Sequence, residues 1–136
     1  MTAKEYLKQY EEAEKMVAMI QEEYNEQIEQ IDNIRSPLGS DGTPRGGGIN
    51  REVEEKAVKL AEKAEELKRA EIYAVEIRQQ IFRKIMQVPG EPGSVLHERY
   101  VNLRKWEEVA DIVGYSIRQT HNLHREGLEI IKSIIS

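Results

Sequence analysis

The segment WEEVADIVGYS, residues 106–116, decides how the C-terminal part of the chain folds. A helix-turn-helix needs a small residue where its two helices cross and a residue that tolerates a positive φ in the turn. Ala110 supplies the small residue, Gly114 supplies the turn residue, and the hydroxyl of Ser116 can cap the next helix. The spacing therefore predicts two helices joined at Gly114, with Val109 facing the core.

The helix that follows Ser116 is expected to turn polar side chains outward on its first turns. Arginine can donate two hydrogen bonds to guanine, and glutamine or asparagine can pair with adenine in the major groove. The free amides of a helix N-terminus also attract phosphate. We therefore predict a DNA-binding surface on this helix, made by Ser116, Ile117, Arg118, Gln119, His121, Asn122 and Arg125.

The longer stretch RYVNLRKWEEVADIVGYSIRQTHNLHREGL, residues 99–128, resembles the region-4 helix-turn-helix of sigma-70-type factors. It is more closely similar to small phage and prophage proteins that join this module to an N-terminal coiled coil, namely ArpU/RinA-like late transcription regulators and phage proteins of unknown function. WEEVA at 106–110 stands where that family has W-E-E-I-A, and GYS at 114–116 stands where it has G-Y-S. The resemblance implies a sequence-specific DNA-binding transcription regulator.

Two departures from the family pattern bear on these expectations. Thr120 occupies a position that is usually aliphatic, which should loosen the core slightly. EGL at 126–128 stands where many relatives have R-A-L, so Glu126 is an anion in place of a cation. From Ser94 onward six basic residues balance six acidic ones, so counterion release gives one copy little affinity for DNA. We therefore expect binding to require two copies of the chain or a partner such as host RNA polymerase.

The rest of the chain carries two long apolar seams on either side of a Gly/Pro cluster. Thr2 opens a capping box, and we expect the first helix to run unbroken from there to Arg35. Asn50 is the expected N-cap of a second helix that ends near Gln87, before Pro89. Two seams of similar length joined by a flexible loop predict an antiparallel helical hairpin.

The seams define which faces of these two helices should be buried. Gln27 is a polar interruption of the first seam, and Glu71 and Arg78 interrupt the second. The first seam has apolar residues at Ala3, Tyr6, Tyr10, Ala13, Val17, Ile20, Tyr24, Ile31 and Ile34. The second has them at Val53, Ala57, Leu60, Ala64, Leu67, Ala74, Ile81, Ile85 and Val88.

A further apolar stripe lies off the second seam, at Ile72, Val75, Phe82 and Met86. Two helices alone cannot cover a second face of this kind. The stripe therefore indicates either docking of the C-terminal piece or a homo-oligomer formed through the helical hairpin.

The predicted fold class is all-α. It comprises a long antiparallel helical hairpin, or coiled coil, at residues 1–88, with a flexible Gly/Pro loop at 36–49, followed by a small sigma-70 region 4-like helix-turn-helix domain at 94–136. In the loop, Arg45 could serve as a basic arm that enters a minor groove, although a disordered loop is the default interpretation.

The composition argues against several other functions. The absence of cysteine excludes disulfides, thiolate zinc sites and thiol nucleophiles. No apolar run approaches the roughly 20 residues of a membrane-spanning helix, and no secretory signal is present, so we expect a cytoplasmic protein. The net charge of -5 weighs little against DNA binding, because residues 1–35 hold nine acidic and four basic residues while the remainder is neutral.

No constellation of residues points to an enzyme, a cofactor or a metal. His121 and His124 lie one helical turn apart, a spacing that a metal site can use. DNA contact explains His121 better than metal binding does. Core packing or phosphate contact explains His124 better. Two other functions stay open beside the transcription regulator. One is a phage small terminase subunit, which also joins a helix-turn-helix to an oligomerising hairpin, and the other is a helical interaction protein that does not bind DNA.

Overall fold

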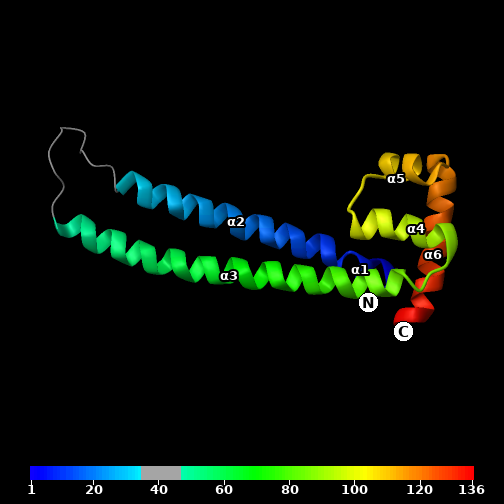
Figure 1. Ribbon diagram of the computed structural model, residues 1–136, viewed down its shortest axis with the longest axis horizontal. Coiled ribbons are helices and arrows are strands. Elements are labelled where there is room, and N and C mark those ends of the chain that lie inside the picture. The colour runs from blue at the N-terminus through cyan, green and yellow to red at the C-terminus, as the bar shows by residue number, and fades with distance from the viewer. Residues whose placement is uncertain (35–46) are drawn as a thin grey trace. The chain divides into compact units, whose positions relative to one another are not determined.

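The structure is a computed structural model that describes residues 1–34 and 47–136, and these residues form helices and no strands. The all-α expectation is thus confirmed for them. The helices are α1 (Ala3–Leu7), α2 (Gln9–Ile34), α3 (Gly47–Ile85), α4 (Gly90–Leu96), the π-helical turn η1 (His97–Val101), α5 (Trp106–Val113) and α6 (Ile117–Ile135) (Figure 1). No helix in this described part is long and apolar enough to cross a membrane. Arg45 lies outside the described residues.

The chain divides into two compact units, which are described separately. Unit 1 contains residues 1–14 and 73–136, and unit 2 contains residues 15–72. Unit 1 therefore combines the first turns of the chain with everything that follows the middle of α3. The domain boundaries predicted from the sequence, at residues 88 and 94, both fall within unit 1.

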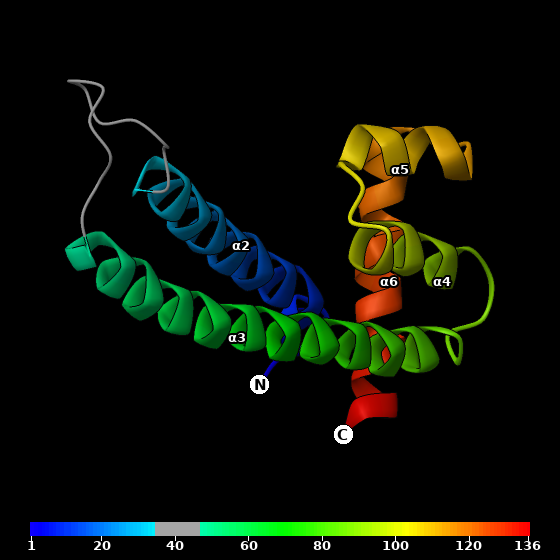
Figure 2. The same ribbon diagram turned by 60° about the vertical axis from the view of Figure 1, so that its left-hand side comes forward.

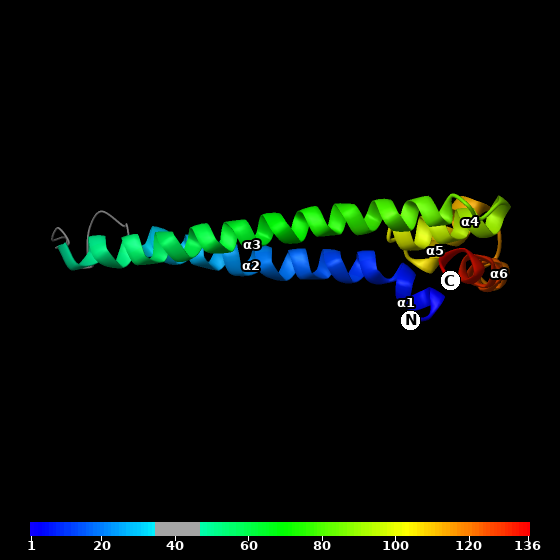
Figure 3. The ribbon, with the colours of Figure 1, turned by 90° about the horizontal axis from the view of Figure 1, so that it is seen from below.

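Unit 2 consists of two helical segments, one from α2 and one from α3, that lie side by side and run in opposite directions (Figures 1 and 3). Ile20, Ile31 and Leu67 are buried in it. Two polar contacts join the segments, since the Nζ of Lys63 lies 2.6 Å from the Glu23 carboxylate and the Nζ of Lys56 donates to the Gln30 Oε1 at 3.4 Å.

The two predicted seams differ in how well they match the buried faces. Every predicted position of the first seam is buried or half-buried. The second seam matches the buried face except at Ala57 and Glu71, which are exposed, while Lys56 and Ile77 take up part of that face. Counting only apolar residues missed Lys56, since a lysine can bury its aliphatic stem and still keep its ammonium group in water.

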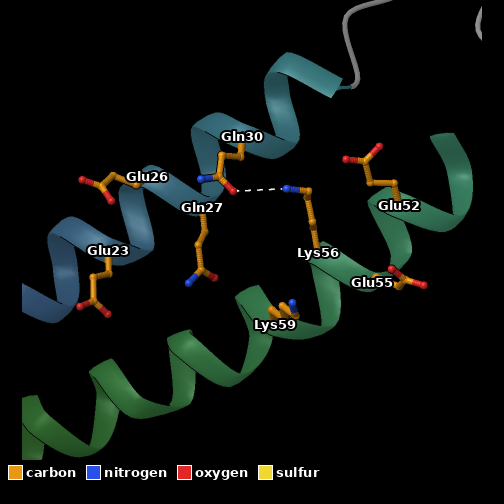
Figure 4. Close-up of a pocket in the computed structure, with 8 residues that line it drawn as sticks. All are labelled: Glu23, Glu26, Gln27, Gln30, Glu52, Glu55, Lys56 and Lys59. Atoms are coloured by element: carbon orange, nitrogen blue, oxygen red, sulfur yellow. Dashed lines mark hydrogen bonds between the residues drawn. The ribbon is translucent and has the colours of Figure 1, made fainter.

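A polar hollow interrupts the helix pair of unit 2. The side chain of Gln27 points into the space between the helices (Figure 4). Its Oε1 is buried and has no hydrogen-bond partner among the described residues. The residues that line the hollow are Glu23, Glu26, Gln27, Gln30, Glu52, Glu55, Lys56 and Lys59. The predicted polar interruption at Gln27 is therefore an unsatisfied amide inside the helix pair.

Unit 1 packs α1 and the end of α3 with the four C-terminal helical elements. Within it α6 contacts α1, α4 and α5, and the crossing of α4 over α6 can be followed in Figure 2. Its core cluster comprises Leu7, Ile77, Ile81, Ile85, Val88, Leu96, Tyr100, Val101 and Ile131. Residues from both ends of the chain thus share one core.

The first helix does not run unbroken from Thr2 to Arg35 as predicted. The capping box is confirmed, because the Glu5 amide donates to the Thr2 Oγ1 at 3.1 Å and the Thr2 amide donates to the Glu5 carboxylate at 3.0 Å. The helix is then interrupted at Lys8, whose ψ of -9° departs from helical geometry. Leu7 lies off the predicted seam but is 0% exposed, so α1 presents a different face to the core than α2 does.

The Pro/Gly-rich segment PGEPG, residues 89–93, contains the start of a helix. Pro89 is the N-cap of α4, and Pro92 lies in its first turn, where the missing amide hydrogen is not needed. A Cβ on Gly93 would stand 2.2 Å from the Val88 carbonyl oxygen, so the sharp connection from α3 to α4 requires glycine there. At the other end of α3, the helix begins at Gly47, and Asn50 lies inside it instead of capping it.

Candidate nucleic-acid interface

The turn between α5 and α6 has the geometry that the spacing predicts. Gly114 adopts φ 79° and ψ 28°, the left-handed region that favours glycine. Its amide donates to the Ala110 carbonyl oxygen at 2.9 Å and so closes α5. Ala110 and Val109 are both buried, which confirms their predicted inward positions.

The start of α6 is fixed by its own polar groups. The Gln119 amide donates to the Ser116 Oγ at 3.1 Å, so Ser116 is the N-cap as predicted. Thr120 is 0% exposed, and its Oγ1 donates to the Ser116 carbonyl oxygen at 2.8 Å. Because this hydroxyl has a partner within its own helix, burying it in an otherwise aliphatic position costs little.

A second close approach in the module involves Gly127 of α6, which is buried against α4. A Cβ at this position would lie 3.0 Å from the Leu96 Cγ and 3.1 Å from the Pro92 carbonyl oxygen. The sequence revealed Ala110 as a small residue at a helix crossing but gave Gly127 no such role. A glycine inside a helix is destabilising unless close packing requires it, and this is the signal in the sequence that could have indicated the crossing.

Aromatic side chains hold α6 against the preceding helices. The Trp106 ring centroid lies 4.4 Å from that of His121 and 4.7 Å from that of His124. The guanidinium of Arg99 stands 4.8 Å from the Trp106 ring centroid, within cation-π distance. The Tyr100 hydroxyl and the His124 Nε2 are 2.7 Å apart. These contacts tie three elements, η1, α5 and α6, to one another.

Burial changes the acid–base behaviour of the Tyr100 and His124 pair. Burial, together with the nearby positive charge of Lys4, lowers the pKa of His124 to about 4. Burial also raises the pKa of Tyr100 to about 12. Of the two roles left open for His124, the structure supports core packing, because this side chain is 9% exposed.

All seven predicted DNA-binding residues are exposed, at the N-cap of α6 and on its first turns. They are Ser116, Ile117, Arg118, Gln119, His121, Asn122 and Arg125. Arg118, Asn122 and Arg125 share one face of the helix because they follow one another at steps of four and three. Neither arginine forms an ion pair within the described part of the chain, so both guanidinium groups can contact another molecule.

Two carboxylates border this surface. The Tyr115 hydroxyl donates to the Glu91 carboxylate at 2.5 Å, which joins the start of α4 to the turn before α6. This hydrogen bond raises the pKa of Tyr115. A small hollow beside the contact is lined by Glu91, Tyr115, Gln119, Asn122, Leu123 and Glu126. Nothing in the sequence indicated the pairing of Glu91 with Tyr115, because it depends on how α4 packs.

The two histidines of α6 lie in different environments. His121 is exposed, with its ring tilted against that of Trp106, whereas His124 is buried beside Tyr100. Among residues 1–34 and 47–136, no group of three or more His, Cys, Asp or Glu side chains is placed to hold a metal ion.

Comparison with known proteins gives no match for the chain. No protein-family model matches it, and no curated protein or solved structure matches it significantly. The resemblance to sigma-70 region 4 therefore rests on the residues between positions 99 and 128.

Proposed function

We propose that this protein is a sequence-specific DNA-binding transcription regulator of a phage or prophage, and that it reads the major groove with α6. The observation that carries the proposal is the exposed set of side chains on the first turns of α6, directly after a left-handed Gly114 and a Ser116 N-cap. This arrangement is what a helix-turn-helix places in the major groove. The proposed activity is binding, with no catalytic residue or cofactor.

The chemistry of the exposed face supports base readout. Arg118 and Arg125 can each donate two hydrogen bonds to guanine, and Asn122 between them can pair with adenine. The cation-π contact of Arg99 and the buried histidine contact fix α6 relative to α5. A recognition helix that is already held in place loses little conformational freedom when it binds.

The charge of residues 94–136 bears on whether one copy of the protein can bind DNA without a partner. Six basic and six acidic residues from Ser94 onward give this region no net charge, and Glu91 and Glu126 border the proposed surface. One copy therefore has a weak attraction for phosphate. We propose that two copies, or one copy with host RNA polymerase, provide the missing affinity, and that residues 1–88 form an oligomerising hairpin beside the sigma-70 region 4-like module.

The experiment that tests this function is a selection of bound sequences from random duplex DNA, followed by titration of the enriched site. We expect one sequence to be enriched. Arg118→Ala should weaken binding to that site by about 1–3 kcal/mol, through loss of a bidentate base contact. The matched control is Arg69→Ala, which removes an exposed arginine from α3 in unit 2 and should leave the affinity unchanged. A selection that enriches no sequence would contradict the proposal.

The exposed apolar stripe on α3 also favours an alternative function, that of a phage small terminase subunit. Terminase subunits of this type recognise DNA as an assembly of many copies, and an uncovered apolar face is what assembly requires. Native mass spectrometry distinguishes the two functions, since a closed ring of many copies indicates a terminase and a dimer indicates the regulator. Absence of any DNA retardation at low salt would instead indicate an interaction protein.

A further inference from the structure

One face of α3 carries apolar side chains that the described part of the chain leaves uncovered. Val75 is 55% exposed, Phe82 is 37% exposed and Met86 is 66% exposed. These residues and Gln79 follow one another at steps of four, three and four, which is the spacing of a heptad seam on one side of a helix. Met86 directly follows α3, and its amide still donates to the Phe82 carbonyl oxygen at 2.9 Å, so the helical spacing extends to it. We name this set of four residues the outer seam. Of the C-terminal elements, η1 reaches the outer seam at Phe82, whose ring centroid lies 5.6 Å from that of His97, whereas Val75 and Met86 stay more than half exposed.

We propose that the outer seam binds the outer seam of a second copy of this chain, in antiparallel orientation, to form a symmetric dimer. If Val75 lies opposite Met86 of the second copy, then Gln79 lies opposite Phe82, because four residues forward along one helix correspond to four residues backward along the other. The two-fold symmetry repeats both pairings. Each of the four positions then has a partner in the other helix.

Charge complementarity supports this register over its neighbour. Glu76 and Arg83 directly follow Val75 and Phe82, so they lie on the same flank of the outer seam. Both are exposed, and neither forms an ion pair among the described residues. In the proposed register Glu76 of each copy lies next to Arg83 of the other copy. The two-fold symmetry therefore gives two ion pairs. Moving the pairing by one heptad would bring Glu76 against Glu76, and like charges in contact are unfavourable.

The surface next to the seam is also shaped to receive a side chain. A hollow at this end of α3 is lined by Phe82, Ile85, Met86, Val88, Pro89, Gly90, Gly93, Ser94, His97 and Glu98. In the antiparallel dimer this hollow of one copy lies at the same end of the outer seam as Ile72 of the other copy, because Ile72 is one turn before Val75 and Val75 pairs with Met86. Ile72 is 49% exposed and extends the apolar contact at that end.

The first test measures the mass of the intact protein in solution by sedimentation equilibrium. The wild-type chain should reach twice its 15.8 kDa mass at micromolar concentrations, and Val75→Glu should remain at the mass of a single chain. Val58→Glu is the matched control, since Val58 is also an exposed valine of α3, 61% exposed, and lies outside the seam. This variant should dimerise like the wild type. Circular dichroism of each variant verifies that its helices are intact.

A charge-reversal experiment tests the register itself. Glu76→Arg gives a chain with two arginines on the flank, Arg83→Glu gives a chain with two glutamates, and neither should dimerise alone. An equimolar mixture of the two variants should form a heterodimer, because each arginine then meets a glutamate of the other chain. A wild-type chain that stays monomeric, a dimer that survives Val75→Glu, or a mixture that stays monomeric would each overturn the proposal. None of these outcomes depends on whether α6 binds DNA.

Discussion

At the scale of single residues, His124 has the clearest energetic role in unit 1. Its ring lies between Trp106 and Tyr100, and it is 9% exposed. Burial lowers its pKa to about 4, so the folded protein keeps this ring neutral over a pH range in which the unfolded chain binds a proton. The contact with Tyr100 is therefore coupled to pH.

We predict that unit 1 loses stability as the pH falls from about 6.5 to about 4, the interval between the unfolded and folded pKa values of His124. The loss should reach at most about 3.5 kcal/mol, because each pKa unit corresponds to about 1.4 kcal/mol. Urea unfolding followed by Trp106 fluorescence at a series of pH values measures it. His124→Gln should remove most of this slope, and His121→Gln, at an exposed position, should retain it. Equal slopes for wild type and His124→Gln would refute the assignment.

At the scale of helices, the local signals in the sequence predicted the structure better than the long-range ones. The capping box at Thr2, the left-handed Gly114 and the Ser116 cap depend on neighbours within a few residues, and all are observed. The interruption at Lys8 was missed because the seam continues through it. Only the burial of Leu7 in a core built from distant residues explains why the helix departs from that seam.

The same contrast between local and long-range signals holds for the candidate interface. The seven residues on α6 could be selected from the sequence because helix periodicity alone decides which side chains turn outward. The contacts that hold this helix could not be predicted, since the Tyr115 bond to Glu91 and the Gly127 crossing depend on the position of α4. A helix that begins inside a Pro/Gly cluster gives no apolar periodicity from which its packing could be derived.

Gln27 provides a prediction at the scale of the helix pair. Its buried Oε1 has no hydrogen-bond partner in the described residues, and an unsatisfied buried polar group costs about 1–3 kcal/mol. Gln27→Leu should therefore stabilise unit 2 by about 1–2 kcal/mol, measured as a shift of its urea midpoint by circular dichroism. Asn33→Leu is the control, since Asn33 is an exposed amide of the same helix, and it should change stability little. A destabilised Gln27→Leu variant would show that the amide has a favourable role in the pair.

At the scale of the whole molecule, unit 1 depends on both ends of the chain. Leu7 is 0% exposed and belongs to the same core cluster as Ile131, and α1 packs on α6. The proposed recognition helix is therefore supported by residues that are almost a full chain length away from it in sequence. A fragment restricted to residues 94–136 lacks this support.

We predict that Leu7→Ala destabilises unit 1 by about 2–5 kcal/mol, the usual cost of a cavity at a fully buried leucine. Trp106 is the single tryptophan of the chain and lies in α5, so its fluorescence reports the unfolding of unit 1. The control is Met16→Ala, which truncates a side chain on α2 that is 53% exposed. An unchanged Trp106 unfolding midpoint in Leu7→Ala would show that α1 does not support the C-terminal helices.

The composition of unit 1 also determines the order in which the chain can fold during its synthesis. Unit 2 is one continuous segment, residues 15–72, and its two helices can pair while the rest of the protein is still being translated. Leu7 is translated before every other residue of its core cluster, and α6, which packs on α1, is translated after the other helices of unit 1. The apolar surface of α1 therefore stays exposed on the nascent chain until α6 has left the ribosome, and exposed surfaces of this kind aggregate readily.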